Sequence, residues 1–245
     1  MNYKKIGVVM FFATLFSISV FGQEEEKLEW GARASFNIGA SVPMYFQNMP
    51  ERFSFSTTFN PSIGGYVNIP IKGDRNHLHL ELTYTHKGNS TEATVKNQYF
   101  KVSDAYLGYV TGDVKTNISL NYIELPIQFR TNLGKNDNGW NVLAGLYLAV
   151  MIEGTFDGIL YQGGTIEDVA GTVSPIGRDT PYDYSHDLVN FDWGAQFGIQ
   201  KQVNRFNFDA QIAWGFNGIF PRGYETVDPN LFNLYGKIGL TYQVW

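Results

Sequence analysis

Serine, histidine and aspartate side chains in two parts of the sequence could carry out nucleophilic chemistry. They are His86 with Ser90, and Ser185 with His186 and Asp183 or Asp187. Nucleophilic catalysis needs a base within hydrogen-bond reach of the hydroxyl and a third group that orients the base. Neighbours such as Ser185 and His186 rarely point at one another in an extended segment. We therefore predict no catalytic residues in either group.

Two further groups contain side chains that metals prefer. His77 and His79 lie two positions apart and share one face of a strand, but no third ligand with suitable spacing accompanies them. Asp179, Asp183 and Asp187 have oxygen ligands of the kind that calcium takes, yet their spacing matches no calcium-binding loop. The sequence therefore predicts neither a metal site nor a cofactor.

The dominant pattern of the chain is an alternation of apolar and polar residues. Between residues 206 and 216, Phe208, Ile212 and Trp214 occupy one parity, whereas Asn207 and Asp209 occupy the other. A period of two predicts a β-strand whose two faces have different surroundings. We predict eight strands, at residues 28–40, 58–69, 76–86, 117–131, 139–152, 188–201, 206–216 and 232–245. Seven of them alternate in this way, whereas the strand at 139–152 is apolar on nearly both faces.

The connections between these strands alternate in length. The short ones, near 72–75, 134–139 and 203–205, contain Gly, Asn and Asp, which tolerate the backbone angles of tight turns. The long ones cover residues 41–57, 87–116, 153–187 and 217–230. Short turns at one rim and long loops at the other are typical of bacterial outer-membrane barrels. The predicted fold class is all-β, an eight-stranded antiparallel transmembrane up-and-down β-barrel.

The first residues of the chain predict export. Two lysines precede an apolar run from Ile6 to Phe21, and Gly22 follows the run. This is the pattern of a signal peptide, so we predict a cleaved segment at 1–22, a single barrel domain at 23–245 and a location in the cell outer membrane. The chain has no cysteine and a net charge of −5. Disulfides are therefore excluded, and nucleic-acid binding is disfavoured.

The polar faces of the predicted strands contain few charges, and both signs are present. The charged residues are Arg33, Glu81, Glu124, Arg130, Asp192, Asp209 and Lys237. A soluble barrel or a β-sandwich would alternate equally well, but its polar face would meet water and be rich in Lys and Glu. Charges withdrawn from water need partners. We therefore predict that these residues form a mutually paired polar network in a narrow lumen without an open channel.

Aromatic residues recur on the apolar faces. We predict that the following residues form a membrane girdle: Trp30, Phe36, Tyr84, Trp140, Phe191, Trp193, Trp214 and Phe216.

Two irregularities fall within the predicted strand at 117–131. The apolar parity changes near Tyr122, which predicts a bulge or a departure from the membrane, and Pro126 has no N–H for the strand ladder.

Six stretches carry a more specific signal when they are taken in order. They are residues 30–37 (WGARASFN), 64–67 (GGYV), 80–88 (LELTYTHKG), 120–127 (LNYIELPI), 142–145 (VLAG) and 191–198 (FDWGAQFG). Together they resemble the PorT-like outer-membrane β-barrel proteins typical of Bacteroidetes, and the stretch at 120–127 is the most distinctive. One departure is the last residue, since barrel proteins of this kind usually end in Phe and this chain ends in Trp245.

The resemblance implies an outer-membrane barrel and, through the named family member, a link to protein secretion and gliding. We predict a noncatalytic barrel that supports the envelope or binds a protein partner through its long loops, above all residues 155–187. The other predicted partners are outer-membrane lipids and lipopolysaccharide, and the barrel assembly machinery during biogenesis. Two alternatives stay open: a small porin or uptake protein, which the low strand number disfavours, and an enzyme that modifies lipid A at the rim.

Overall fold

The computed structural model of the protein describes residues 28–44, 52–71, 75–103, 106–134, 139–227 and 229–244. These residues form one antiparallel sheet of 12 strands. The strands are β1 (Glu29–Pro43), β2 (Phe53–Thr57), β3 (Pro61–Pro70), β4 (Asn76–Ser103), β5 (Tyr106–Asn132), β6 (Trp140–Leu160), β7 (Thr165–Asp168), β8 (Val173–Pro175), β9 (Thr180–Asp183), β10 (Phe191–Val203), β11 (Phe206–Gly215) and β12 (Leu231–Gln243). One turn of 3-10 helix, η2 (Ser185–Asp187), precedes β10. No helix among the described residues is long and apolar enough to cross a membrane. The predicted signal peptide and Trp245 lie outside the described residues.

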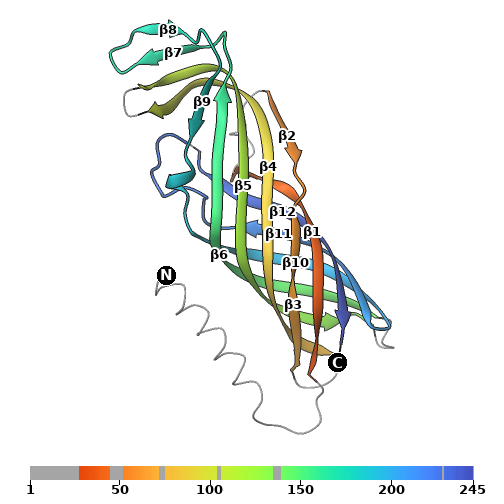
Figure 1. Ribbon diagram of the computed structural model, residues 1–245. Coiled ribbons are helices and arrows are strands. Elements are labelled where there is room, and N and C mark those ends of the chain that lie inside the picture. Colours follow the sequence, from red (N-terminus) through yellow and green to blue (C-terminus); the bar gives the residue numbers. More distant parts are fainter. Residues whose placement is uncertain are drawn as a thin grey trace.

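Eight of the strands pair in a closed ring (Figure 1). The order of neighbours is β4, β3, β1, β12, β11, β10, β6 and β5, and β5 pairs with β4 to close the ring. The predicted count of eight strands is wrong for the sheet as a whole, which has 12. The additional strands β2, β7, β8 and β9 are short and pair beyond the ring.

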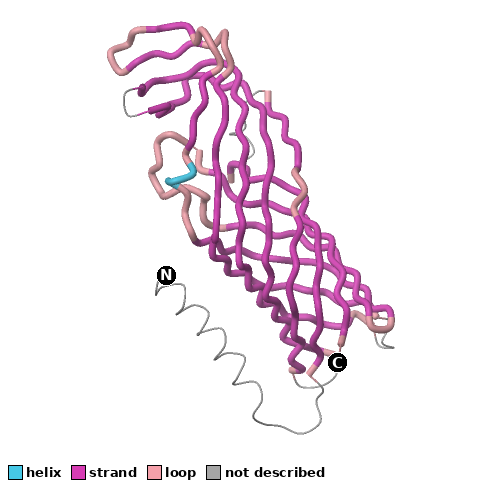
Figure 2. Tube along the Cα trace, in the orientation of Figure 1, coloured by secondary structure: helices cyan, strands magenta, loops and turns pink. Residues whose placement is uncertain are grey.

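Three consecutive ring strands continue far beyond the others. β4, β5 and β6 have 28, 27 and 21 residues, whereas β3 and β11 have 10 each. With β2, β7, β8 and β9 they form a curved sheet at the end of the ring opposite to the short turns (Figures 1 and 2). We call this part, residues 88–103, 106–116 and 153–187 together with β2, the extension. The predicted loop at 87–116 is therefore wrong, because β4 and β5 run through most of it.

The ring strands have a polar inner face and an apolar outer face. In β11, Asn207, Asp209 and Gln211 are buried inside, whereas Phe208 and Ile212 are 53% and 61% exposed on the outside. Successive side chains of an extended strand point to opposite faces, so the alternating sequence sorts itself in this way. Soluble proteins bury apolar residues and expose polar ones. The ring has the opposite arrangement.

Tight turns join the ring strands at one end. Only Asn204 and Arg205 connect β10 to β11, and Asn204 has a φ of 55°. Asn tolerates this left-handed conformation better than most residues. Gly139, with a φ of 71°, occupies a similar conformation just before β6. Asn204 and Gly139 therefore adopt the positive φ angles for which the sequence analysis expects Asn and Gly in these turns.

The change of pattern near Tyr122 has its origin in the ring interior. The inward positions of β5 keep one parity from Arg130 through Tyr122 to Val110. The interior itself changes, since it is polar near Arg130 and apolar beyond Tyr122. A bulge is present at this height, but it lies in the neighbouring strand β6, where Ile152 is the extra residue opposite the junction of Asn121 and Tyr122.

Pro126 also interrupts the regular pairing. It lies on the inner face of β5, where it cannot donate a hydrogen bond to a ladder. The pairs formed with β4 on either side of it are Leu80 with Ile127 and Thr83 with Glu124, and the ladder is interrupted between them. This interruption is the local irregularity that the sequence predicts.

Candidate functional site

The interior of the ring contains a network of buried ion pairs, which we call the interior network. Its members are the cations Arg33, Lys87, Arg130 and Lys237 and the carboxylates Glu81, Glu124, Asp192 and Asp209. Each of these residues keeps 4% or less of its surface exposed. A lone charge would be costly in such surroundings. Each of the eight has a partner of opposite sign, and the partner of Arg130 is the half-buried Glu29.

Glu124 lies at the centre of the interior network, where two lysines reach it from different strands. Lys87 Nζ lies 3.0 Å from Glu124 Oε2, and Lys237 Nζ pairs with Glu124 Oε1. Lys87 Nζ also lies 3.3 Å from Asp192 Oδ2. The same ammonium lies 4.6 Å from the ring centroid of Tyr147, within the range of a cation–π contact. One carboxylate therefore holds two ammonium groups.

Arg33 joins two further carboxylates. Its Nη1 and Nη2 donate to Asp209 Oδ2 and Oδ1 at 2.7 and 2.8 Å, and its Nε lies 3.0 Å from Glu81 Oε2. A planar guanidinium is suited to such a bidentate contact. Gly239 of β12 lies between the strands that bear Arg33 and Asp209. A Cβ at this position would lie 2.5 Å from Asp209 Oδ2 and 2.7 Å from Arg33 Nη2.

We expect Gly239→Ala to lower the free energy of unfolding by about 1–3 kcal/mol, because the added methyl group overpacks the Arg33–Asp209 contact. Gly236→Ala on the same strand is the control, since a Cβ there would meet no atom closer than Ile38 O at 3.6 Å. Urea unfolding in lipid vesicles, followed by tryptophan fluorescence, measures both variants. Equal stability of the two variants would contradict the role that we assign to Gly239.

Near the short turns, His79 and Arg130 continue the interior contacts. His79 Nε2 lies 2.7 Å from Glu81 Oε1, and its Nδ1 lies 2.5 Å from Asn68 Oδ1. Asn68 Nδ2 donates to Glu29 Oε2 at 2.8 Å, which turns the Asn68 oxygen toward the imidazole. Arg130 Nη1 donates to the same Glu29 oxygen at 3.4 Å. Nowhere in the described part of the chain do three or more His, Cys, Asp or Glu side chains gather as a metal site would require.

The structure places all seven charged residues that the sequence assigns to the lumen inside the ring: Arg33, Glu81, Glu124, Arg130, Asp192, Asp209 and Lys237. It adds Lys87 and Glu29, which the sequence analysis missed. Lys87 falls at the start of the predicted loop 87–116, yet it shares the parity of Glu81 and is fully buried. Continuing the alternation of that strand by one more inward position would have identified it.

The predicted girdle residues lie on the outer face of the ring. Trp30, Tyr84, Trp140, Phe191, Trp193, Trp214 and Phe216 are between 38% and 47% exposed, whereas Phe36 is half-buried. Phe36 packs against Phe59, with the ring centroids 5.3 Å apart. Near the extension, Trp193 and Phe216 meet edge to face at 5.1 Å between centroids. The contact of these rings with lipid stays a prediction.

The serine and histidine candidates make contacts other than those of a catalytic group. Ser185 Oγ donates to Asp183 Oδ1 at 2.5 Å. Hydrogen bonds from the hydroxyl and the amide of Ser185 lower the pKa of Asp183. His86 and Ser90 each contact a different asparagine side chain. Within the described residues, neither serine hydroxyl is hydrogen-bonded to a histidine.

Apolar side chains fill the mouth of the ring on the side of the extension. The inward residues of β5 change from Glu124 to Tyr122, Leu120 and Ile118, and each of these is 3% exposed or less. They belong to an apolar cluster that continues into the extension and includes Phe100, Val110, Val114, Phe156, Leu160, Tyr182, Tyr184 and Phe220. The polar interior is therefore covered by an apolar layer at this end.

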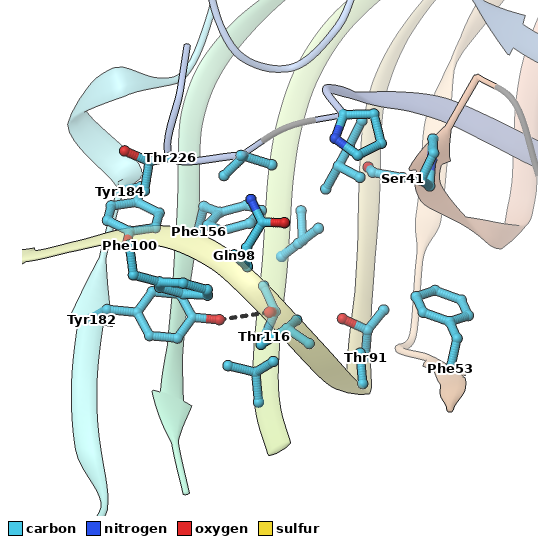
Figure 3. A pocket seen from close by; sticks show the side chains of 18 residues that line it. Ser41, Phe53, Thr91, Gln98, Phe100, Thr116, Phe156, Tyr182, Tyr184 and Thr226 are labelled. Atoms are coloured by element: carbon cyan, nitrogen blue, oxygen red, sulfur yellow. Dashed lines mark hydrogen bonds between the residues drawn. The ribbon is translucent and has the colours of Figure 1, made fainter. Parts of the chain in front are cut away.

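A cavity of about 160 Å³ opens within this apolar layer (Figure 3). One side of the cavity is an aromatic wall formed by Phe100, Phe156, Tyr182 and Tyr184, and Phe53 of β2 lies across from it. The rings of the wall pack on one another, with Phe100 and Tyr182 edge to face at 5.4 Å between centroids. Ser41 of β1 and Leu231 of β12 also line the cavity, so strands from both ends of the sequence border one space.

A few uncharged polar groups complete the cavity. Tyr182 donates its hydroxyl to Lys115 O at 3.1 Å and lies 2.6 Å from Thr116 Oγ1. Burial raises the pKa of Tyr182, which keeps this hydroxyl protonated. The Gln98 amide points into the space and has no hydrogen-bond partner among the described residues (Figure 3). None of the described residues that line the cavity is charged.

Comparison with known proteins gives one clear match. A family model described as an outer membrane protein beta-barrel domain matches residues 21–221. The matched range contains β1 to β11 and all of the extension. No curated protein matches the chain.

Proposed function

The chain belongs to the outer membrane protein β-barrel domain family, and from this premise we propose that it is a noncatalytic barrel of the outer membrane. The eight-stranded ring spans the membrane, and the extension projects from the outer surface and binds a partner. The family itself suggests the outer-membrane location. The inverted polarity of the ring carries the proposal: Ile212 and Ile238 are each 61% exposed on the outer face, whereas Asp209 and Lys237 are 4% exposed inside.

The length of the ring strands supports a membrane span. A transmembrane strand needs about 9–11 residues when it is tilted, and β3 and β11 each have 10. Exposed apolar residues occur along the whole of β11, from Phe206 to Trp214. Outer-membrane barrels keep their short turns in the periplasm and their long segments outside. By the same rule the extension lies at the cell surface.

The filled interior favours a closed barrel over a small porin. Arg33, Lys87 and Glu124 are 3% exposed or less and bind partners on other strands. Side chains fill the interior of a ring of this size, and here the apolar cluster also covers its mouth. A lipid-modifying enzyme at the rim receives no support from the contacts of His86 or Ser185.

The resemblance to PorT-like proteins extends the proposal to protein secretion. In this role the extension binds a secretion partner at the cell surface. β2 and β8 are the terminal strands in the order of the sheet, and an extended segment of a partner can pair with such edges. Loss of secreted proteins from a deletion strain would support this role, and an unchanged set of secreted proteins would contradict it.

We expect the purified protein to migrate faster in a detergent gel before boiling than after it, because a closed ring of paired strands resists the detergent until it is heated. The same preparation should give no steady conductance in a planar lipid bilayer, since side chains fill the interior. A protein that stays monomeric in buffer without any detergent would contradict the membrane location. A stable open-channel conductance would contradict the closed interior.

A further inference from the structure

The cavity at the outer mouth of the ring has the composition of a ligand site. Ligand sites combine apolar walls with a small number of polar groups that fix orientation. Here Phe100, Phe156 and Tyr184 provide the wall, and Gln98 directs an amide without a partner into the space (Figure 3). Gln98 is half-buried, so its amide borders the opening of the cavity and is accessible to a molecule that enters it.

The size and charge of the cavity limit what it can hold. Its volume is about 160 Å³, and an apolar protein cavity of about 150 Å³ accommodates benzene. It therefore has room for one ring-sized apolar group. Aromatic walls receive such a group well, because rings pack both edge to face and offset. No described lining residue is charged, so none of the described groups would compensate the charge of a charged ligand.

We propose that this cavity binds a small uncharged molecule, or the end of a larger one, that has a ring-sized apolar group and one hydrogen-bonding substituent. The ring packs against the aromatic wall, and the substituent bonds with the Gln98 amide. The inference goes beyond the protein partner proposed above and rests on the proposed membrane arrangement, because the ligand must reach the extension from outside the cell.

Titration with 5-fluoroindole tests this inference, since the probe is an uncharged ring with one N–H donor. The full-length mature protein is held in lipid nanodiscs and the probe is followed by fluorine NMR, with empty nanodiscs as the reference for partition into lipid. We expect saturable binding with a Kd below about 1 mM. Partition no greater than that into empty nanodiscs overturns the proposal.

Two alanine substitutions locate the binding. Ala93 lines the cavity, so Ala93→Phe fills it and should weaken 5-fluoroindole binding by about tenfold or more. Ala170 is exposed between β7 and β8, so Ala170→Phe should leave the affinity within about twofold. Binding to Ala93→Phe that is as tight as binding to the unchanged protein overturns the proposal.

Gln98→Leu separates the polar contact from the packing, and it keeps the volume of the side chain. This variant should weaken binding of 5-fluoroindole about fivefold and leave binding of fluorobenzene unchanged, because fluorobenzene has no N–H. Equal effects on both probes would overturn the role of Gln98. The heat-dependent gel mobility of the same samples reports on the barrel separately, so an intact barrel without probe binding rejects the ligand inference alone.

Discussion

Glu124→Gln should lower the free energy of unfolding by about 3–5 kcal/mol, the cost of removing one partner from a buried ion pair. The amide keeps the shape of the carboxylate, but Lys87 and Lys237 remain buried with less negative charge beside them. Lys87 keeps Asp192 at 3.3 Å. Lys237 keeps no carboxylate within ion-pair distance among the described residues. Urea unfolding in lipid vesicles, followed by tryptophan fluorescence, measures the change.

Glu92→Gln is the matched control for this substitution. Glu92 pairs with Lys115 at 3.9 Å on the surface of the extension, and the two side chains are 58% and 38% exposed. Exposed pairs of this kind contribute about 0–1 kcal/mol, so the control should unfold close to the unchanged protein. Similar small effects at Glu92 and Glu124 would mean that water shields the buried lysines, which contradicts a closed interior.

The ring could be predicted from the sequence because each of its faces has one kind of surroundings along a whole strand. Gln211 and Ile212 are neighbours in β11, and their side chains meet different surroundings only because they point in opposite directions. Residue types with a period of two are then sufficient to identify the strand. The same parity assigned Arg33 and Asp209 to the interior, although it could not say that they pair, since 176 positions separate them.

The extension could not be predicted because the surroundings of its strands change. In β5 the buried inward residues include the polar Arg130, Gln128 and Glu124, and beyond them the apolar Leu120, Ile118, Val114 and Val110. The outward residues beyond Tyr122 are largely polar, as expected for a face that meets water. Apolar residues therefore occupy the outward positions of β5 in one half and the inward positions in the other. In the sequence this looks like a bulge in β5, but the bulge lies in β6. Lys87 was missed because the predicted strand ends at residue 86, one position before it, whereas β4 continues to Ser103.

The cavity is also beyond the reach of sequence patterns. Phe53, Gln98, Phe156 and Tyr182 come from four different strands, and each residue type is ordinary where it stands. Only the pairing of β2 with β4 and of β9 with β6 brings these residues around one space. A local pattern can predict a strand and its faces. It carries no information about which distant strands will border the same opening.

Ile238→Arg should lower the free energy of unfolding in lipid vesicles by about 2–4 kcal/mol, which is the cost of an arginine on the lipid face at the middle of a bilayer. Ile238 lies near the middle of β12, pairs with Phe36 on one side and Ala210 on the other, and is 61% exposed. If hydrocarbon surrounds this side chain, the guanidinium has to leave water there. Equilibrium urea unfolding in the same vesicles measures the effect.

Val173→Arg separates the effect of lipid from the effect of an exposed charge. Val173 of β8 is β-branched like Ile238 and is 60% exposed, but it lies in the extension, far from the ring (Figure 1). Water surrounds this position in the proposed arrangement, so the substitution should change the stability by no more than about 0.5 kcal/mol. Because the two exposures match, a difference between the variants reports what the side chains touch. Equally small effects would put both positions in water and contradict a membrane-spanning ring.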